Sequence, residues 1–204
     1  MDINLKLFDL IKNNKSQEFI DLLNNNDDID LNIRDSLNNY LIEYAISSNN
    51  VRIVEILLQK TCKLDIYDYE SRCILYYPIK YNYLDILDLI LKYEKNSVGF
   101  LLNDLDDNDG LYPIHYCITL RNIEAIKILL KYNIDINKFD KSNNSILHYA
   151  VKSRNIKILD LICKNITNFN NININGETPM HYAANLNKIE LIDILLEYDI
   201  NLNL

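Results

Sequence analysis

The stretch NGETPMHYAA, residues 175–184, contains the signals for a tight turn followed directly by the start of a helix. Gly176 tolerates the positive φ of a turn, Thr178 is a favourable helix N-cap, and Pro179 suits the first helical position. Residues 188–198 then place isoleucine and leucine at helical spacing, which predicts a second helix. Two helices this short cannot bury their apolar faces alone, so we expect the pair to stack on copies of itself.

The same pattern recurs along the chain with a fixed period. Each copy opens on a leading residue, usually aspartate, and has a tyrosine nine residues later. The leading residues are Asp35, Asp68, Asp107, Asp140 and Asn173, and the tyrosines are Tyr44, Tyr77, Tyr116, Tyr149 and Tyr182. Successive copies are separated by 33, 39, 33 and 33 residues, so the second copy contains six extra residues. Repeats of this length predict a solenoid.

These copies resemble ankyrin repeats, whose pattern of a turn, TPLH, a second helix and an extended tail recurs about every 33 residues. NGETPMHYAA is the best match, DGLYPIHYC and NNSILHYA vary it, and LNNYLIEYAI and ESRCILYYPI match through their register. The resemblance implies an all-α ankyrin-repeat solenoid, with helix-turn-helix pairs joined by β-hairpin or extended loops. The expected units are a capping or degenerate repeat at 1–34, and five repeats at 35–67, 68–106 with the insertion, 107–139, 140–172 and 173–204.

Asparagine stands at many positions where ankyrin repeats have glycine. It replaces the turn glycine at Asn38 and Asn143, with Ser71 in the second repeat, and it follows the first helix at Asn49, Asn82 and Asn187. Asparagine tolerates the left-handed backbone better than other non-glycine residues. We therefore expect these residues to have positive φ.

Pro78 lies inside the expected first helix of the second repeat, where the family has alanine. Proline lacks the backbone N–H that an internal helical residue donates. We expect this helix to be distorted or to begin late, and we expect irregular structure where the extra residues lie.

The three histidines, His115, His148 and His181, are 33 residues apart and each precedes a tyrosine. They could be metal ligands, catalytic residues or one structural position copied three times. Packed helices lie about 10 Å apart, whereas zinc ligands lie about 2 Å from one ion. We predict a structural role, and the resemblance implies a bond to the Thr or Ser three residues earlier. This residue is present for His148 and His181, whereas His115 has Tyr112 there. Since no catalytic motif is recognised either, we expect no enzyme activity, metal or cofactor.

The composition argues against two classes of partner. The 204 residues include 29 acidic and 21 basic ones, and the net charge of −8 opposes binding to nucleic acid or to anionic membranes. The N-terminal residues do not resemble a signal peptide, and no segment offers eighteen uncharged residues. The four cysteines form no CxxC pair and suit a reducing compartment. We predict a cytoplasmic protein, in the host cytoplasm if it is viral.

The resemblance implies a noncatalytic adaptor or scaffold that binds a protein on the concave face of the stack, formed by hairpin tips and first helices. One alternative is a viral or parasite effector that acts on host proteins, because the high content of Asn, Ile and Lys indicates an AT-rich genome. The other alternative is a regulatory domain of a larger enzyme. The residues that we predict to be exposed on this face and to contact the partner are Leu37, Tyr69, Arg72, Tyr81, Leu111, Leu120, Lys141, Ile174 and Leu186.

The last expected helix is as apolar as the equivalent internal helix in the preceding repeat. A solenoid needs a polar outer face on its terminal repeat. We therefore expect this face to be covered by further chain, by a partner, or by a second copy in end-to-end self-association.

Overall fold

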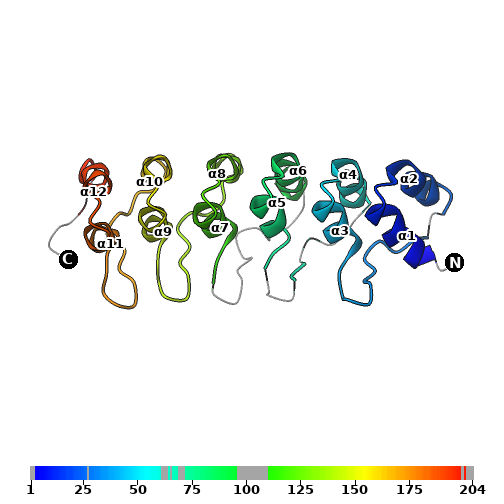
Figure 1. The fold of residues 1–204 in the computed structure, drawn as a ribbon, viewed down its shortest axis with the longest axis horizontal. Coiled ribbons are helices and arrows are strands. Elements are labelled where there is room, and N and C mark those ends of the chain that lie inside the picture. The colour runs from blue at the N-terminus through cyan, green and yellow to red at the C-terminus, as the bar shows by residue number, and fades with distance from the viewer. Residues whose placement is uncertain are drawn as a thin grey trace.

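The computed structural model describes residues 3–26, 28–60, 64, 66–68, 72–95, 110–198 and 200. Within these ranges the chain forms twelve helices, arranged as six pairs in a single row (Figure 1). The described residues contain no strand, although isolated antiparallel bridges such as Arg34 to Tyr40 and Phe139 to Ser145 occur at the hairpins. The predicted all-α solenoid is confirmed, with a helix pair at the N-terminus and five more after it.

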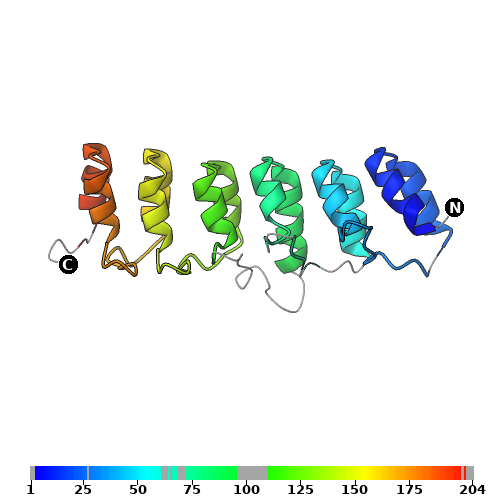
Figure 2. The same ribbon diagram turned by 60° about the horizontal axis from the view of Figure 1, so that its bottom comes forward.

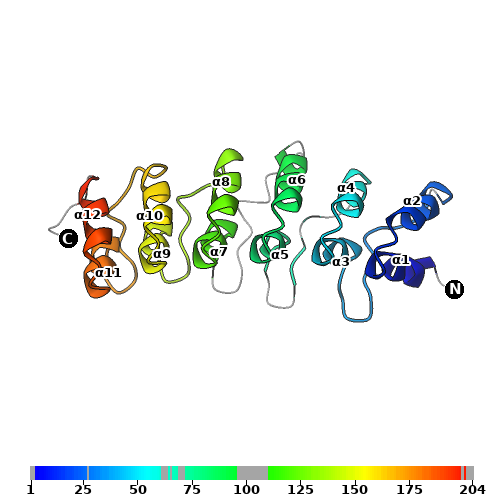
Figure 3. The ribbon, with the colours of Figure 1, turned by 45° about the horizontal axis from the view of Figure 1, so that its top comes forward.

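Each pair contributes one helix to each of two rows, which can be told apart in Figure 3. The first helices are α1 (Ile3–Lys12), α3 (Leu41–Ser47), α5 (Tyr76–Lys80), α7 (Pro113–Thr119), α9 (Ile146–Lys152) and α11 (Pro179–Asn185). The second helices are α2 (Ser16–Asn24), α4 (Val51–Gln59), α6 (Leu84–Lys95), α8 (Ile123–Lys131), α10 (Ile156–Cys163) and α12 (Ile189–Leu196). We call the side with the hairpin turns and first helices the first-helix face, and the opposite side the second-helix face.

The hydrophobic core runs the length of the row, between the pairs as well as within them. Each first helix packs against the first helix of the next pair, and α4, α6 and α8 pack against one another in the same way. Ile126 and Leu129 of α8 are fully buried, as are Ile86 and Leu87 of α6. The pairs therefore stand as parallel columns that share their apolar faces (Figure 2).

The turn asparagines adopt the left-handed backbone that the sequence predicts. Asn38 and Asn143 have φ of 68° and 58° in their hairpins, and the position after the first helix has φ of 51° at Asn49, 58° at Asn82 and 50° at Asn187. Ser71 lies outside the described residues. In the third and fourth repeats the same position holds Arg121 and Arg154, each with φ of 56°. Arginine has a Cβ and lacks the short polar side chain by which asparagine tolerates the left-handed backbone. Both arginines therefore carry backbone strain.

Replacing Arg154 with glycine is expected to raise the free energy of unfolding by about 0.5–1 kcal/mol, because glycine adopts positive φ without the Cβ clash. Arg154 is exposed, so little packing is lost. The midpoint of urea unfolding should rise at an unchanged slope. Arg154→Ala keeps the Cβ and should bring no such gain; equal midpoints for the two variants would contradict the explanation.

Pro78 shortens the first helix of its repeat. Helix α5 has five residues, whereas α3, α7, α9 and α11 have seven, and it begins at Tyr76, two residues later than its counterparts. Pro78 is then the third helical residue, where the backbone N–H needs no partner within the helix. The predicted late start is confirmed. The segment expected to hold the six extra residues falls largely on 96–109, outside the described residues.

Candidate partner-binding surface

The described hairpins of the first-helix face are built around their leading residue, which is aspartate in the first, second and fourth repeats and Asn173 in the fifth. In the first repeat Asp35 Oδ1 accepts hydrogen bonds from the backbone N–H of Leu37 and Asn39, at 2.9 and 3.0 Å. Tyr44 donates its hydroxyl to Asp35 Oδ2 at 2.5 Å, and Tyr149 donates to Asp140 Oδ2 at 2.6 Å. Asp35 and Asp140 therefore have a structural role in their turns. The nine-residue spacing to tyrosine corresponds to a hydrogen bond that ties these turns to their first helices.

These bonds also set the ionisation of the turn carboxylates. Burial alone raises the pKa of Asp140, but hydrogen bonds from Asn144, Tyr149 and Ser142 outweigh it and leave the pKa below its ordinary value. The same balance lowers the pKa of Asp35. Both side chains are therefore charged acceptors at neutral pH, and they hold the hairpins in place.

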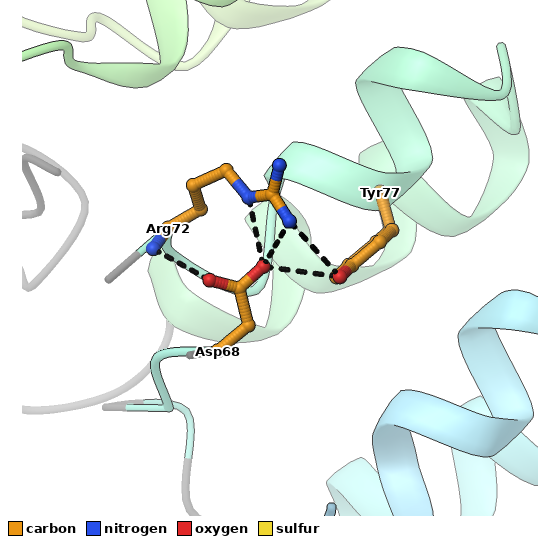
Figure 4. Close-up of polar contacts among 3 residues, drawn as sticks. All are labelled: Asp68, Arg72 and Tyr77. Carbon is orange, nitrogen blue, oxygen red and sulfur yellow. Dashed lines mark hydrogen bonds and ion pairs between the residues drawn. The ribbon is translucent and has the colours of Figure 1, made fainter. Parts of the chain in front are cut away.

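Arg72 is part of such a hairpin, and its side chain is not exposed as the sequence predicts (Figure 4). Its guanidinium pairs with Asp68 at 2.7 Å and lies 4.2 Å from the centre of the Tyr76 ring. Tyr77 donates its hydroxyl to the same carboxylate at 3.0 Å. The side chains of Arg72 and Asp68 are 13% and 5% exposed. The expected exposure of Arg72 is therefore wrong, because the aspartate four residues earlier in the same repeat binds its guanidinium.

The electrostatics of this group agree with a structural role. Burial alone lowers the pKa of Arg72, but the hydrogen bond and charge of Asp68 more than reverse it, and the pKa lies above its ordinary value. Burial and the bond to Asp68 raise the pKa of Tyr77 to about 12. Removing the Arg72 guanidinium would leave a nearly buried carboxylate without its cation, which is costly. Arg72→Ala is therefore unsuitable as a binding test.

The histidines stabilise the starts of first helices and the stacking of repeats. In His148, Nδ1 accepts from the backbone N–H of Ser145 at 3.1 Å and lies 2.9 Å from the Ser145 hydroxyl, which places the ring proton on Nε2. Nε2 then donates to the carbonyl oxygen of Glu177, in the next repeat, at 3.1 Å. His181 makes the equivalent bonds to Thr178. Burial lowers the pKa of His148, so its imidazole is neutral. The predicted structural role is confirmed for both.

The structure places the remaining predicted contact residues in three classes. Leu37, Tyr81, Leu120, Lys141 and Ile174 are exposed, as expected. Leu111 and Leu186 were predicted to be exposed, but both are half-buried and pack against the core. They lie at the edges of α7 and α11, where an apolar side chain can fold back onto its own repeat. Tyr69 lies outside the described residues.

A hollow of about 180 Å³ opens on the first-helix face between α3 and α5. Its described lining consists of Asn39, Glu43, Tyr44, Ser47 and Tyr77. Asn39, Glu43 and Ser47 are spaced by four residues, so they follow one side of α3 and the turn before it. Sequence reasoning missed this hollow. The available signal was Glu43, which takes the position that His115, His148 and His181 hold in later repeats.

Glu43 is a half-buried carboxylate in acidic surroundings. Its Oε2 accepts the backbone N–H of Tyr40 at 2.6 Å, which caps the start of α3. Burial raises the pKa of Glu43, and the charges of Asp68 and Asp35 raise it further, against the Tyr40 bond and the charge of Arg34. The carboxylate therefore lies where an additional positive charge would be favourable.

Tyrosine rings continue the surface along α5. The rings of Tyr77 and Tyr81 stack with centroids 6.2 Å apart, and the ring centroids of Tyr81 and Tyr83 are 5.7 Å apart. The amino group of Lys80 lies 5.4 Å from the Tyr81 centroid. Tyr81 is 47% exposed in spite of these contacts. We call the hollow residues together with Tyr81 the α3–α5 surface.

Helix α12 exposes Ile189 and Leu196. This agrees with the apolar character that the sequence gives to the last helix. Self-association through this side stays a prediction.

The ranges that the structure describes contain neither a candidate metal site nor a helix that could span a membrane. Within them, no three His, Cys, Asp or Glu residues are grouped so that they could hold a metal ion. None of the helices described there is both long enough and apolar enough to cross a membrane.

Comparison with known proteins agrees with the geometry. The family model described as ankyrin repeats (3 copies) matches residues 7–98, 93–173 and 141–204. Ankyrin repeat protein L371 of Acanthamoeba polyphaga mimivirus is 38% identical over 144 residues, which cover 70% of this chain and 19% of that protein. Ankyrin repeat protein FPV014 of Fowlpox virus is 31% identical over 139 residues, 68% of this chain and 30% of that protein. The chain thus spans less than a third of either viral relative.

A solved structure extends the similarity to nearly the whole chain. The crystal structure of the ankyrin repeat domain of Bcl-3, a member of the IkappaB protein family, superposes with a TM-score of 0.87. The alignment covers 96% of this chain and 86% of that one, at 19% sequence identity. At this identity the likeness concerns the fold.

Proposed function

The chain belongs to the ankyrin-repeat family, and from that premise we propose that it binds a protein partner on its first-helix face, with the α3–α5 surface at the centre of the contact. Ankyrin-repeat domains are generally protein-protein interaction modules and typically noncatalytic. The repeats provide the scaffold, and the side chains that differ between repeats provide the recognition.

The observation that carries the proposal is the combination of a hollow with an exposed aromatic residue beside it. Interface hot spots are enriched in tyrosine, and they gather where one partner offers a pocket. Tyr81 supplies a large, rigid and partly apolar contact surface at low entropic cost. The hollow next to it presents a carboxylate, an amide and a hydroxyl, which can fix the orientation of a partner.

A more specific form of the proposal is that the chain acts on proteins of a host cell. The similarity to ankyrin repeat proteins of mimivirus and Fowlpox virus supports it, together with the composition typical of an AT-rich genome. The partner would then be met in the host cytoplasm.

Affinity capture followed by mass spectrometry, in cells of the natural setting, tests the proposal. Tyr81→Ala and Ser47→Arg change exposed side chains of the α3–α5 surface, so we expect the fold to persist and the main partner to be lost, by at least about tenfold. Ile156→Ala is a matched control on α10, because Ile156 is 48% exposed on the second-helix face. Glu55→Arg on α4 is the control for the added charge.

Retention of the partner by both α3–α5 variants, with loss in the controls, would place the contact on the second-helix face and refute the proposal. Circular dichroism of all four variants establishes whether any of them has lost its helices.

A further inference from the structure

We propose that the hollow between α3 and α5 accepts an arginine side chain of the protein partner, with Glu43 pairing with the guanidinium and the rings of Tyr44 and Tyr77 contacting its plane. This inference rests on the proposed function and names the chemistry of its central contact. It commits to one occupant, a protein-borne arginine.

The lining of the hollow offers the groups that a guanidinium requires. Arginine carries five N–H donors in a planar fork and no acceptor. The Glu43 carboxylate, the Asn39 amide oxygen and the Ser47 hydroxyl are acceptors, and they are arranged along one side of α3. Tyr44 and Tyr77 add aromatic rings, over which a guanidinium can stack.

The charges around the hollow favour a cation. Among the described residues that line it, Glu43 is the one that carries a charge. Asp35 and Asp68 disfavour ionisation of Glu43 through their charges, as burial also does. A cation placed beside Glu43 reduces both penalties, because it replaces lost solvation and opposes the repulsion.

Three cationic side chains of the described residues lie near the hollow and already contact other groups of the chain. The guanidinium of Arg34 lies 4.2 Å from the Tyr40 centroid and donates to Asn38 at 2.8 Å. The amino group of Lys12 lies 4.4 Å from the Tyr44 centroid, and Arg72 pairs with Asp68. The described lining includes none of these three.

The same chemistry already binds an arginine one repeat further along. Arg72 lies against a carboxylate, a tyrosine hydroxyl and the face of a tyrosine ring, as Figure 4 shows for Asp68 and Tyr77. The hollow presents a carboxylate, tyrosine rings and polar acceptors without an arginine of the chain among its described lining. Lysine suits it less well, because an ammonium group is a point charge that cannot stack or bind two oxygens in a plane.

A titration of the isotopically labelled chain with N-acetyl-arginine amide, followed by NMR, tests the inference. We expect saturable shifts of the Asn39 side-chain amide and the Ser47 backbone amide. N-acetyl-citrulline amide has nearly the same shape without the charge, and N-acetyl-lysine amide has the charge without the planar fork. Both should bind at least about tenfold more weakly, the scale of one charged hydrogen bond.

Glu43→Gln and Glu55→Gln form the matched pair of variants. Glutamine can still accept the Tyr40 N–H, so α3 keeps its cap. Glu43→Gln should weaken binding of the arginine probe at least about tenfold, and Glu55→Gln on α4 should leave it unchanged. Equal binding of the arginine and lysine probes, no saturable shift, or unaltered binding to Glu43→Gln would each overturn the inference.

The two proposals fail in different ways. If the partner is lost with Tyr81→Ala and Ser47→Arg but the arginine probe gives no shift, the binding face stands and the arginine contact is refuted. If the probe binds as expected while the α3–α5 variants keep the partner, the hollow is confirmed as an arginine site and the proposed function is refuted.

Discussion

Replacing Leu129 with alanine is expected to lower the free energy of unfolding by about 3–4 kcal/mol. Leu129 is 0% exposed, in helix α8, which packs against α6 of the preceding pair and α7 of its own. The shorter side chain loses the transfer energy of its buried carbons and leaves a cavity, because stacked repeats on both sides limit relaxation. So large an effect is expected because the core lies between repeats as well as within them.

Leu130, the next residue, is the matched control. It is half-buried in the same helix, so Leu130→Ala makes the same chemical change with less burial lost. We expect a cost of about 1 kcal/mol, in proportion to its smaller buried area. Urea unfolding followed by circular dichroism measures both values at a shared slope. Similar costs for the two variants would contradict the assignment of the buried side of α8.

Replacing Gly110 with alanine is expected to cost about 2–4 kcal/mol, from two sources. Gly110 has φ of +77°, which an L-residue with a Cβ adopts at a cost of about 1–2 kcal/mol. A Cβ at this position would also lie 2.9 Å from the backbone nitrogen of Lys141 in the next hairpin. A backbone atom cannot move away by a change of rotamer, as a flexible side chain can. The hairpins that contain Gly110 and Lys141 would therefore have to separate.

Gly176 allows the cost of the positive φ to be measured without the close approach of a neighbouring hairpin. It occupies the same position in the last repeat with φ of +75°, and an added Cβ would meet nothing within 4 Å. Gly176→Ala should therefore cost about 1 kcal/mol, the backbone strain alone. Thermal unfolding of the two single variants gives the comparison. If Gly176→Ala proved as costly as Gly110→Ala, close approach of the hairpins would not be what requires glycine.

The features that recur with the period were predictable from the sequence. The turn residues, the leading aspartates and the histidines obey local rules of backbone geometry and hydrogen bonding, so each copy repeats the same structure. Asn38 and Asn49 have the positive φ expected of asparagine in these positions, and His148 bonds to Ser145 as the resemblance implied. The late start of α5 also has a local cause, because it follows from the missing backbone N–H of Pro78.

The features specific to one repeat were harder to predict. The sequence predicted an exposed Arg72 because the repeat register gives the position of a residue but not the rotamer of its side chain. In the structure the side chain pairs with Asp68, four residues earlier. The hollow depends on Glu43 and Tyr77, which come from different repeats and have no sequence relationship that marks them as neighbours. Binding surfaces of repeat proteins are formed by such pairs, so the site follows from the sequence less readily than the scaffold does.

Site-specific photocrosslinking in the natural cellular setting tests the central claim, that a protein partner binds the first-helix face at the α3–α5 surface. The chain would carry Ser47→p-benzoylphenylalanine, and a second version Glu55→p-benzoylphenylalanine, since both native residues are exposed and lie on opposite faces. We expect one reproducible crosslinked protein from position 47, and we expect that protein to be absent from the crosslinks at position 55. The same protein crosslinked from position 55 and absent from position 47 would contradict the account.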